Sequence, residues 1–293
     1  MPWQAFALVV LAGLIHAGWN IVAKRTSGDA RFAFFTSVVM GVVWAPLALW
    51  VGHESVPHWD WRAWTAVTVS GVVHVIYFVT LLRGYRKGDL TVVYPLARGS
   101  GPLLTSLLAI TLLGERISLV AASGIVGIVL GVFFVAGGPA LWRQGRDEAS
   151  RNRLRAGVMY GLLTGVFIAS YTFVDGYAVK VLLLSPILVD YMGNFVRLAV
   201  LAPTVLRDRA ETVQLWRTQW RSAAIVGVFG PVAYVLVMYA MQMAPLSHVA
   251  PAREVSMLFA AVIGGHLLGE SDRGVRIVGA CAIALGVVAL GLG

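Results

Sequence analysis

Three arginines of this sequence lie inside long apolar segments, where a charged side chain needs a partner. They are Arg98, Arg197 and Arg253, and Arg253 is followed directly by Glu254. An arginine at the centre of a bilayer costs about 2.5–3.5 kcal/mol on insertion scales, so each should be paired or line a polar cavity. A guanidinium held away from water prefers a carboxylate. These residues therefore predict carboxylate binding, either of a substrate or of another helix.

Arg253 and Glu254 are expected to contact different partners. Neighbouring residues on a helix point about 100° apart and do not pair with each other. Arg253 is predicted to reach a central cavity or the opposite half of the chain. For Glu254 the candidate partners are His16 and Tyr94. Two roles stay open for the pair: a substrate or gating site, and a structural tie between helices.

Aromatic and small polar residues in other apolar segments complete the candidate substrate site. His16 and Asn20 lie one helical turn apart with Trp19 beside them, a pattern that suits either a cavity wall or interhelical hydrogen bonds. An aromatic wall with a few placed polar groups suits an amino-acid-sized ligand, although single Tyr and Trp residues also serve as packing or interface anchors. The predicted substrate-binding residues are His16, Trp19, Asn20, His74, Tyr77, Tyr94, Arg98, Tyr171, Asp175, Tyr234, Arg253 and Glu254.

A polar stripe is expected along one face of the segment 185–206. Asp190, Asn194 and Arg197 have i, i+4, i+7 spacing, which places them on the same side of a helix. The two charges can satisfy each other with Asn194 between them. We therefore interpret this stripe as structural.

Three residues mark bends or ends of apolar segments. Pro102 follows two glycines and predicts a kinked or broken helix, whose freed backbone groups could coordinate a ligand. Glu115 and Glu270 end two apolar segments at equivalent places. We expect both to be helix-end or gate residues rather than substrate ligands.

The composition indicates a membrane protein. Of the 293 residues, 58% are hydrophobic and only 13% are charged, a balance that a soluble surface does not tolerate. Apolar windows of 18 or more residues recur along the chain, and each can cross about 30 Å of hydrocarbon. We predict an all-α membrane protein with ten transmembrane helices, at residues 4–23, 32–51, 61–82, 91–113, 117–136, 155–179, 185–206, 221–243, 246–268 and 274–292.

The two halves of the sequence resemble each other. The segment "LLGERISLVAASGIVGIVLGV" (112–132) matches "LLGESDRGVRIVGACAIALGV" (267–287) at an offset of 155, which also pairs Arg98 with Arg253. Five spans in each half would insert in opposite senses, as two inverted repeats with a substrate site at mid-depth between them. The predicted units are residues 1–140, a basic cytoplasmic linker at 141–154, and residues 155–293.

The distribution of Lys and Arg predicts the orientation. Seventeen of the 23 basic residues lie in alternate loops, three lie in the other loops and three lie within spans. By the positive-inside rule, the basic loops face the cytoplasm. We therefore predict a multi-pass protein of the inner membrane with both termini on its outer face.

Several function classes are excluded or disfavoured by what the sequence lacks. The net charge of +9 comes from short loops and forms no basic domain, so nucleic acid is not an expected partner. No Walker-type phosphate loop, metal-ligand spacing or GxSxG motif is found. We expect no enzymatic activity, no cofactor and no metal. The expected partners are a small-molecule substrate and the lipid bilayer, with a monomer as the expected unit.

Over nearly its whole length the chain resembles the drug/metabolite transporter superfamily, specifically its ten-helix EamA-type members. The resemblance rests on the five-plus-five repeat, on "LLGE" after spans 4 and 9, on "HAGWN" (16–20), and on "VYPLARGSGPLL" against "VAPAREVSMLF". It implies a transporter of small metabolites. The aromatic-rich spans are most similar to those of exporters of amino acids and related metabolites.

These observations predict a secondary transporter that exports amino acids by alternating access. The substrate carboxylate is expected at Arg98 or Arg253, and its ammonium at Glu254 or Asp175. Proton coupling through Glu254 or His16 and uncoupled transport stay open. The alternatives are export of lipophilic cations or drugs, export of another small carboxylate or a phosphorylated metabolite, and a receptor or scaffold that transports nothing.

Overall fold

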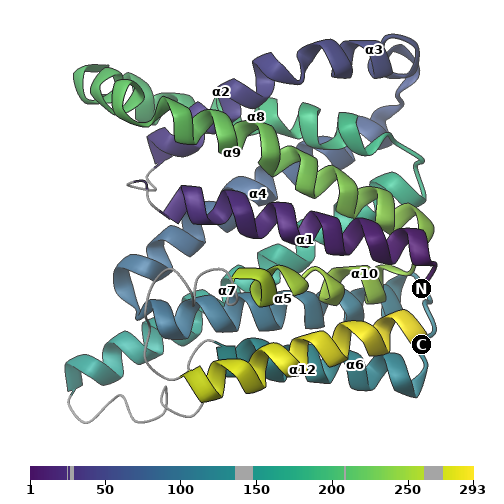
Figure 1. Cartoon of the computed structure of the whole chain (residues 1–293). Coiled ribbons are helices and arrows are strands. Elements are labelled where there is room, and N and C mark those ends of the chain that lie inside the picture. The colour runs from purple at the N-terminus through teal and green to yellow at the C-terminus, as the bar shows by residue number, and fades with distance from the viewer. Residues whose placement is uncertain (25, 27–29, 136–147, 208, 261–272) are drawn as a thin grey trace.

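The computed structural model describes residues 1–24, 26, 30–135, 148–207, 209–260 and 273–293. These residues form α-helices, one short 3-10 helix and the turns between them, without a strand (Figure 1). The elements are α1 (Trp3–Lys24), α2 (Ala30–Val43), α3 (Ala45–Ser55), η1 (Val56–His58), α4 (Trp61–Lys87), α5 (Leu90–Leu112), α6 (Leu119–Val135), α7 (Glu148–Lys180), α8 (Pro186–Leu206), α9 (Arg209–Met243), α10 (Leu246–Ala252) and α12 (Arg273–Leu292).

Several helices have the length and composition of membrane spans. Within the described ranges, Trp3–Ala23, Trp61–Lys87, Arg151–Lys180 and Arg209–Met243 each qualify, and α2 with α3 forms a further segment bent by 62°. The predicted all-helical membrane architecture is therefore confirmed. The total of ten spans is not confirmed, and the ninth predicted segment, 246–268, lies partly outside the described residues. The predicted linker 141–154 also lies partly outside them, and its last residues belong to α7.

Helices of the first half, α1–α6, pack mainly on helices of the second half. The most extensive contacts join α6 to α12, α5 to α7, α1 to α9 and α4 to α7 (Figure 1). The pattern is reciprocal: α1 packs on α9 as α7 packs on α4, and α2 packs on α9 as α8 packs on α4. Such reciprocity is expected when two equivalent units are related by a pseudo-two-fold axis.

The pair α6 and α12 approaches closely through repeat-related glycines. A Cβ atom at Gly124 would lie 2.7 Å from the carbonyl oxygen of Gly286, and one at Gly131 would lie 2.7 Å from that of Gly279. Small residues allow membrane helices to come into backbone contact. Gly124 and Gly131 correspond to Gly279 and Gly286 in the repeat, so each glycine packs against the counterpart of the other.

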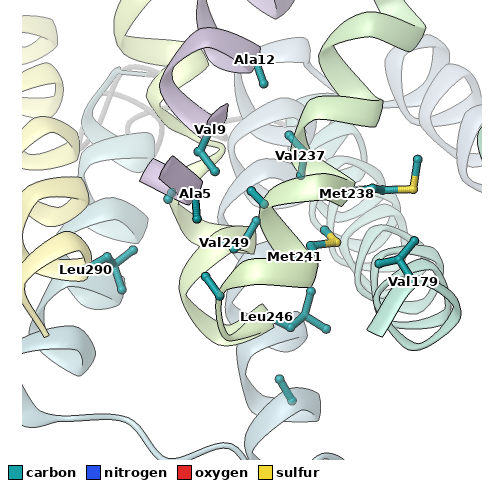
Figure 2. Close-up of a cluster of buried hydrophobic side chains, with 14 of the residues drawn as sticks. Ala5, Val9, Ala12, Val179, Val237, Met238, Met241, Leu246, Val249 and Leu290 are labelled. Carbon is teal, nitrogen blue, oxygen red and sulfur yellow. The ribbon is translucent and has the colours of Figure 1, made fainter. Parts of the chain in front are cut away.

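The largest buried apolar cluster lies at the end of the molecule that carries both termini (Figure 1, Figure 2). Figure 2 shows Val9 of α1 and Met241 of α9 in this cluster together with Leu246 and Val249 of α10. The first and last residues also meet here, because the Met1 amino group donates to the carbonyl oxygen of Gly291 over 3.1 Å. Side chains from both halves therefore fill the space between the helices at this end.

The helix that starts with α10 is broken at Arg253 and Glu254. The Glu254 amide donates to the carbonyl of Pro251 and the Met257 amide to that of Glu254, a tighter pattern than an α-helix has, and regular helix resumes at Val255. The broken helix therefore lies in the second half, and the break predicted near Pro102 is not found in α5.

Helix α5 itself is continuous from Leu90 to Leu112. It packs along α7 so closely that a Cβ atom at Gly101 would lie 2.7 Å from Ile168. This packing holds the helix together although Pro102 lacks an amide hydrogen.

Candidate functional site

A cavity of about 240 Å³ lies among helices of both halves. Residues of α1, α2, α4, α5, α7, α8 and α9 line it, together with the turn after α10. Val9, Ala12 and Val237 belong both to this lining and to the apolar cluster, so the cavity begins where the cluster ends. Eight predicted substrate residues line it: His16, Trp19, His74, Tyr77, Arg98, Tyr171, Tyr234 and Arg253.

Arg98 and Glu254 form an ion pair between the two halves. The Arg98 Nε and Glu254 Oε2 atoms are 3.0 Å apart, and the side chains are only 17% and 4% exposed. Arg98 also donates to the Ser256 hydroxyl over 3.1 Å. The expected partners of Glu254, His16 and Tyr94, are thus wrong, because the turn after α10 packs on α5 rather than presenting Glu254 to them.

Arg253 has a different environment from that of Arg98. Its guanidinium lies over the ring of Tyr234, 5.4 Å from the ring centroid, and it lines the cavity. Within the described part of the chain it forms no ion pair and no side-chain hydrogen bond. The prediction that Arg253 and Glu254 contact different partners, with Arg253 at the cavity, is confirmed.

Aromatic rings from four helices line the cavity. His74 of α4 stacks on Tyr171 of α7 with ring centroids 3.9 Å apart, and Tyr77 and Tyr234 meet Tyr171 edge to face at 5.5 and 6.4 Å. On α1, the rings of His16 and Trp19 lie 4.7 Å apart. The His74 ring is held by the backbone carbonyl of Ser70 at 2.9 Å. Ring-to-ring packing therefore fixes these side chains.

The stripe on α8 lines the same cavity, which its interpretation as structural missed. Arg197 donates to the Asp190 carboxylate over 2.7 Å, so the expected internal pairing is confirmed. Asn194 does not bridge the two charges, because its amide group donates to the carbonyl of Ser37 on α2. All three side chains face the cavity. The signal that could have revealed this was Arg197 itself, an arginine inside an apolar segment.

Four predicted substrate residues do not line this cavity. Asn20 donates to the carbonyl of His16 one turn earlier on its own helix. Tyr94 is 38% exposed on α5. Asp175 is fully buried and accepts a hydrogen bond from the hydroxyl of Tyr234. The fourth, Glu254, is occupied by its ion pair with Arg98.

Glu115, predicted to be a helix-end or gate residue, ties three elements together at the end that carries the termini. Its carboxylate accepts the amides of Leu246 and Ser247 over 2.8 and 2.9 Å, and it pairs with Lys180 at 3.2 Å. Burial alone would raise the pKa of the Glu115 carboxyl, but these hydrogen bonds and the Lys180 charge outweigh burial and hold it below its usual value. Glu270, its counterpart, lies outside the described residues.

A bundle of membrane-length helices around a charged, aromatic cavity is the architecture of a multi-pass membrane protein. The chain belongs to the EamA-like transporter family, which it matches over residues 3–137 and 155–292. The family resemblance predicted from the sequence is thereby confirmed, and with it a two-repeat membrane transporter of small solutes.

Comparison with solved structures agrees with this fold. One crystal structure aligns with 100% of this chain and 98% of its own length, with a TM-score of 0.76 and 16% sequence identity. At that identity the likeness concerns the fold alone. No curated protein sequence matches the chain.

Proposed function

We propose that this protein exports small carboxylates, and amino acids in particular, across the inner membrane by alternating access. The observation that carries the proposal is the Arg253 guanidinium, which faces the cavity without an acidic partner in the described residues. A guanidinium in a desolvated site binds a carboxylate through two parallel hydrogen bonds. Arg253 is therefore the proposed carboxylate ligand.

The charge balance of the cavity favours an anionic group over a cation. Glu254 neutralises Arg98, and Asp190 neutralises Arg197, at 3.0 and 2.7 Å. Arg253 then leaves one positive charge in excess. A lipophilic cation would be repelled by this charge and would find the lining carboxylate, Asp190, already paired with Arg197, so the cationic-drug alternative is disfavoured.

The size and charge of the cavity favour a small monoanionic group. Its volume of about 240 Å³ is below the range of about 300–1,000 Å³ that is usual for drug-sized ligands. A phosphate monoester carries a charge of about −1.5 to −2 at pH 7, more than one guanidinium neutralises. A carboxylate on a small metabolite matches both quantities.

An amino acid would also find groups for its ammonium and its side chain. The Asn194 side-chain oxygen is buried and has no hydrogen-bond partner in the described part of the chain. It offers an acceptor for an ammonium group. The rings of Tyr77 and Tyr171 offer an apolar face for the side chain. Asn194 replaces Glu254 and Asp175 as the proposed ammonium ligand, because neither carboxylate lines the cavity.

The membrane arrangement is part of the same proposal. Two inverted five-helix repeats with basic loops in the cytoplasm would place both termini outside, and a monomer holds the complete cavity. Alkaline phosphatase fused to Gly293 should be active, and a fluorescent cytoplasmic reporter at the same residue should be dark. The reverse result would overturn this orientation.

Transport by purified protein in proteoliposomes tests the substrate class. Amino acids should exchange across the membrane, whereas lipophilic cations and sugar phosphates should not. Arg253→Gln should weaken amino-acid uptake by at least about 30-fold, since losing a charge-assisted contact in a dry site costs on the order of 2–5 kcal/mol. Arg253→Lys should keep part of the activity, because the charge remains and the two-point geometry is lost.

The matched control is Arg62→Gln. Arg62 also lies over an aromatic ring, that of Trp61 at 5.6 Å, but it is exposed at the start of α4. Its variant should transport as wild type does. Cation exchange without amino-acid exchange, or an Arg253→Gln protein with normal amino-acid uptake, would contradict the proposal.

A further inference from the structure

Asp175 differs from the other buried acids near the cavity because no cation neutralises it. The carboxylates of Glu254 and Asp190 each have an arginine within 3.0 Å, whereas Asp175 forms no ion pair with any described residue. Its side chain is completely buried in α7, a helix of membrane-spanning length. Its carboxylate accepts the hydroxyl of Tyr234.

The groups that face Asp175 come from each helix packed around it. A small pocket of about 10 Å³, space for about one water molecule, lies beside the carboxyl group. Arg197 and Asp190 on this pocket neutralise each other, so no net charge compensates Asp175. The polar and titratable groups on the pocket are Ser70 and His74 of α4, Asp190 and Arg197 of α8, and Tyr234 of α9. Arg98 of α5 and Arg253 and Glu254 of the turn after α10 line the neighbouring pocket beside Thr172.

An ionised carboxylate without a counter-charge is unfavourable in such a place. The interior of a membrane protein solvates charge poorly, so a buried acid that lacks a cation binds a proton instead. Tyr234 donates its hydroxyl to this acid, and its ring, which lines the cavity, lies under the Arg253 guanidinium. The Tyr234 side chain therefore contacts both the unpaired carboxyl group of Asp175 and the unpaired guanidinium of Arg253.

We propose that Asp175 is a proton-binding site linked through Tyr234 to carboxylate binding at Arg253. A proton from water adds to a carboxylate oxygen of Asp175, and the reverse step returns it to water. A substrate carboxylate at Arg253 and an ionised Asp175 repel each other across Tyr234. Protonation of Asp175 therefore strengthens substrate binding, and substrate binding draws in a proton. The substrate arm of this inference rests on the proposed function.

The pH dependence of amino-acid exchange in proteoliposomes tests the linkage. Exchange at equal pH on both sides reports affinity without a proton gradient. Wild-type affinity for the amino acid should fall as the pH rises. The fall should be about 5- to 150-fold, which is typical of two linked binding sites. Asp175→Asn should hold the high affinity of the protonated form at every pH. Asp175→Glu, which keeps a titratable group, should restore the pH dependence.

Two control variants separate Asp175 from other titrating groups. Glu148→Gln removes an exposed acid at the start of the same helix and should keep the wild-type profile. His74→Gln removes the imidazole on the same small pocket. If His74→Gln loses the pH dependence while Asp175→Asn keeps it, the titration belongs to the histidine and the proposal is overturned.

Infrared difference spectroscopy of the protein without substrate tests proton binding independently. Wild type should show the carbonyl stretch of a protonated carboxylic acid that disappears as the pH rises and is missing in Asp175→Asn. If that band is present and no amino acid exchanges, the proposed function fails and the proton site stands. A wild-type spectrum without a titrating acid that depends on Asp175 would overturn the proton site. An exchange profile that does not change with pH would overturn the linkage.

Discussion

Arg98 and Arg253 occupy equivalent positions in the two halves, 155 residues apart, but their surroundings are opposite. Arg98 is paired with a carboxylate at 3.0 Å, whereas Arg253 lies over an aromatic ring and faces the cavity without an acid. The residue that follows each arginine explains the difference. Glu254 follows Arg253 and crosses to Arg98, while Gly99 follows Arg98 and offers nothing in return.

The backbone differs at the same two places. Helix α5 continues past Arg98, but the helix that starts with α10 is broken at Arg253 and Glu254. At this turn two adjacent side chains reach different elements, Glu254 meeting Arg98 of α5 and Arg253 meeting Tyr234 of α9. Each repeat therefore carries an arginine at the equivalent position, and the difference between the two repeats leaves a single uncompensated charge at the cavity.

The largest effect should come from breaking the pair on the first arginine. Glu254→Ala leaves Arg98 buried without a counter-charge and should lower the free energy of unfolding by about 3–5 kcal/mol. Arg253→Ala removes only a cation–π contact and should cost at most about 2 kcal/mol. Unfolding of both variants in detergent micelles measures the contrast.

A double variant checks the cause of that loss. Replacing Arg98 and Glu254 together by Met removes both charges and keeps similar volume, so most of the lost stability should return. Equal losses for Glu254→Ala and Arg253→Ala would show that the two arginines are not in different electrostatic states.

A smaller loss of stability is expected at Glu115, which joins the first half to the second. Glu115→Ala removes a carboxylate that accepts two backbone amides and pairs with Lys180, which should cost about 1.5–3 kcal/mol at pH 7. The pKa of Glu115 is lowered in the folded protein. Its stabilisation is therefore complete above the unfolded-state value of about 4.3 and is lost as the pH falls through the lowered pKa.

Thermal unfolding at two pH values separates this contact from others. The gap in melting temperature between wild type and Glu115→Ala should be full at neutral pH and should close in strong acid. A gap that is the same at both values would mean that the carboxylate charge contributes nothing.

Where the halves are alike, equivalent substitutions should have equal effects. Gly124 and Gly279 are counterparts, and a Cβ atom at either would lie 2.7 Å from a backbone oxygen of the facing helix. Gly124→Ala and Gly279→Ala should each cost about 1–3 kcal/mol through overpacking. Similar losses for the two glycines, beside unequal losses for the two arginines, would confine the asymmetry to the cavity. A marked difference between the stability losses of the two glycine variants would mean that the asymmetry between the halves extends beyond the cavity to the whole fold.

The sequence reveals the helices, the repeat and many residues that face the cavity, because apolar periodicity and internal similarity are local properties. Charged residues inside apolar segments also identify the interior correctly, as Arg98 and Arg253 demonstrate. The sequence does not reveal which side chains these charged residues contact. Glu254 meets Arg98 because α10 packs on α5, a contact between residues 156 positions apart that no spacing rule contains.

Two predictions made from local sequence were corrected by contacts with other helices. Pro102 predicts a break, but packing against α7 keeps α5 continuous, so tertiary contacts override the local signal. The stripe from Asp190 to Arg197 satisfies itself as its spacing predicts, yet it also lines the cavity. A paired charge can still face a site, and spacing along one helix does not report what lies across from it.

The smallest effect is expected at the ring that holds the second arginine. Tyr234→Leu removes the aromatic face under Arg253, worth about 0.5–2 kcal/mol, and should weaken amino-acid binding by roughly 2- to 30-fold. Tyr234→Phe keeps the ring and loses only the hydroxyl bonded to Asp175, so its affinity at acidic pH should stay near that of wild type. Exchange measured at acidic pH, where the proposed proton site is filled, isolates the contribution of the ring. If Leu and Phe weaken binding equally, the hydroxyl rather than the ring positions Arg253, and the contrast between an arginine held by a carboxylate and one held by an aromatic face is wrong.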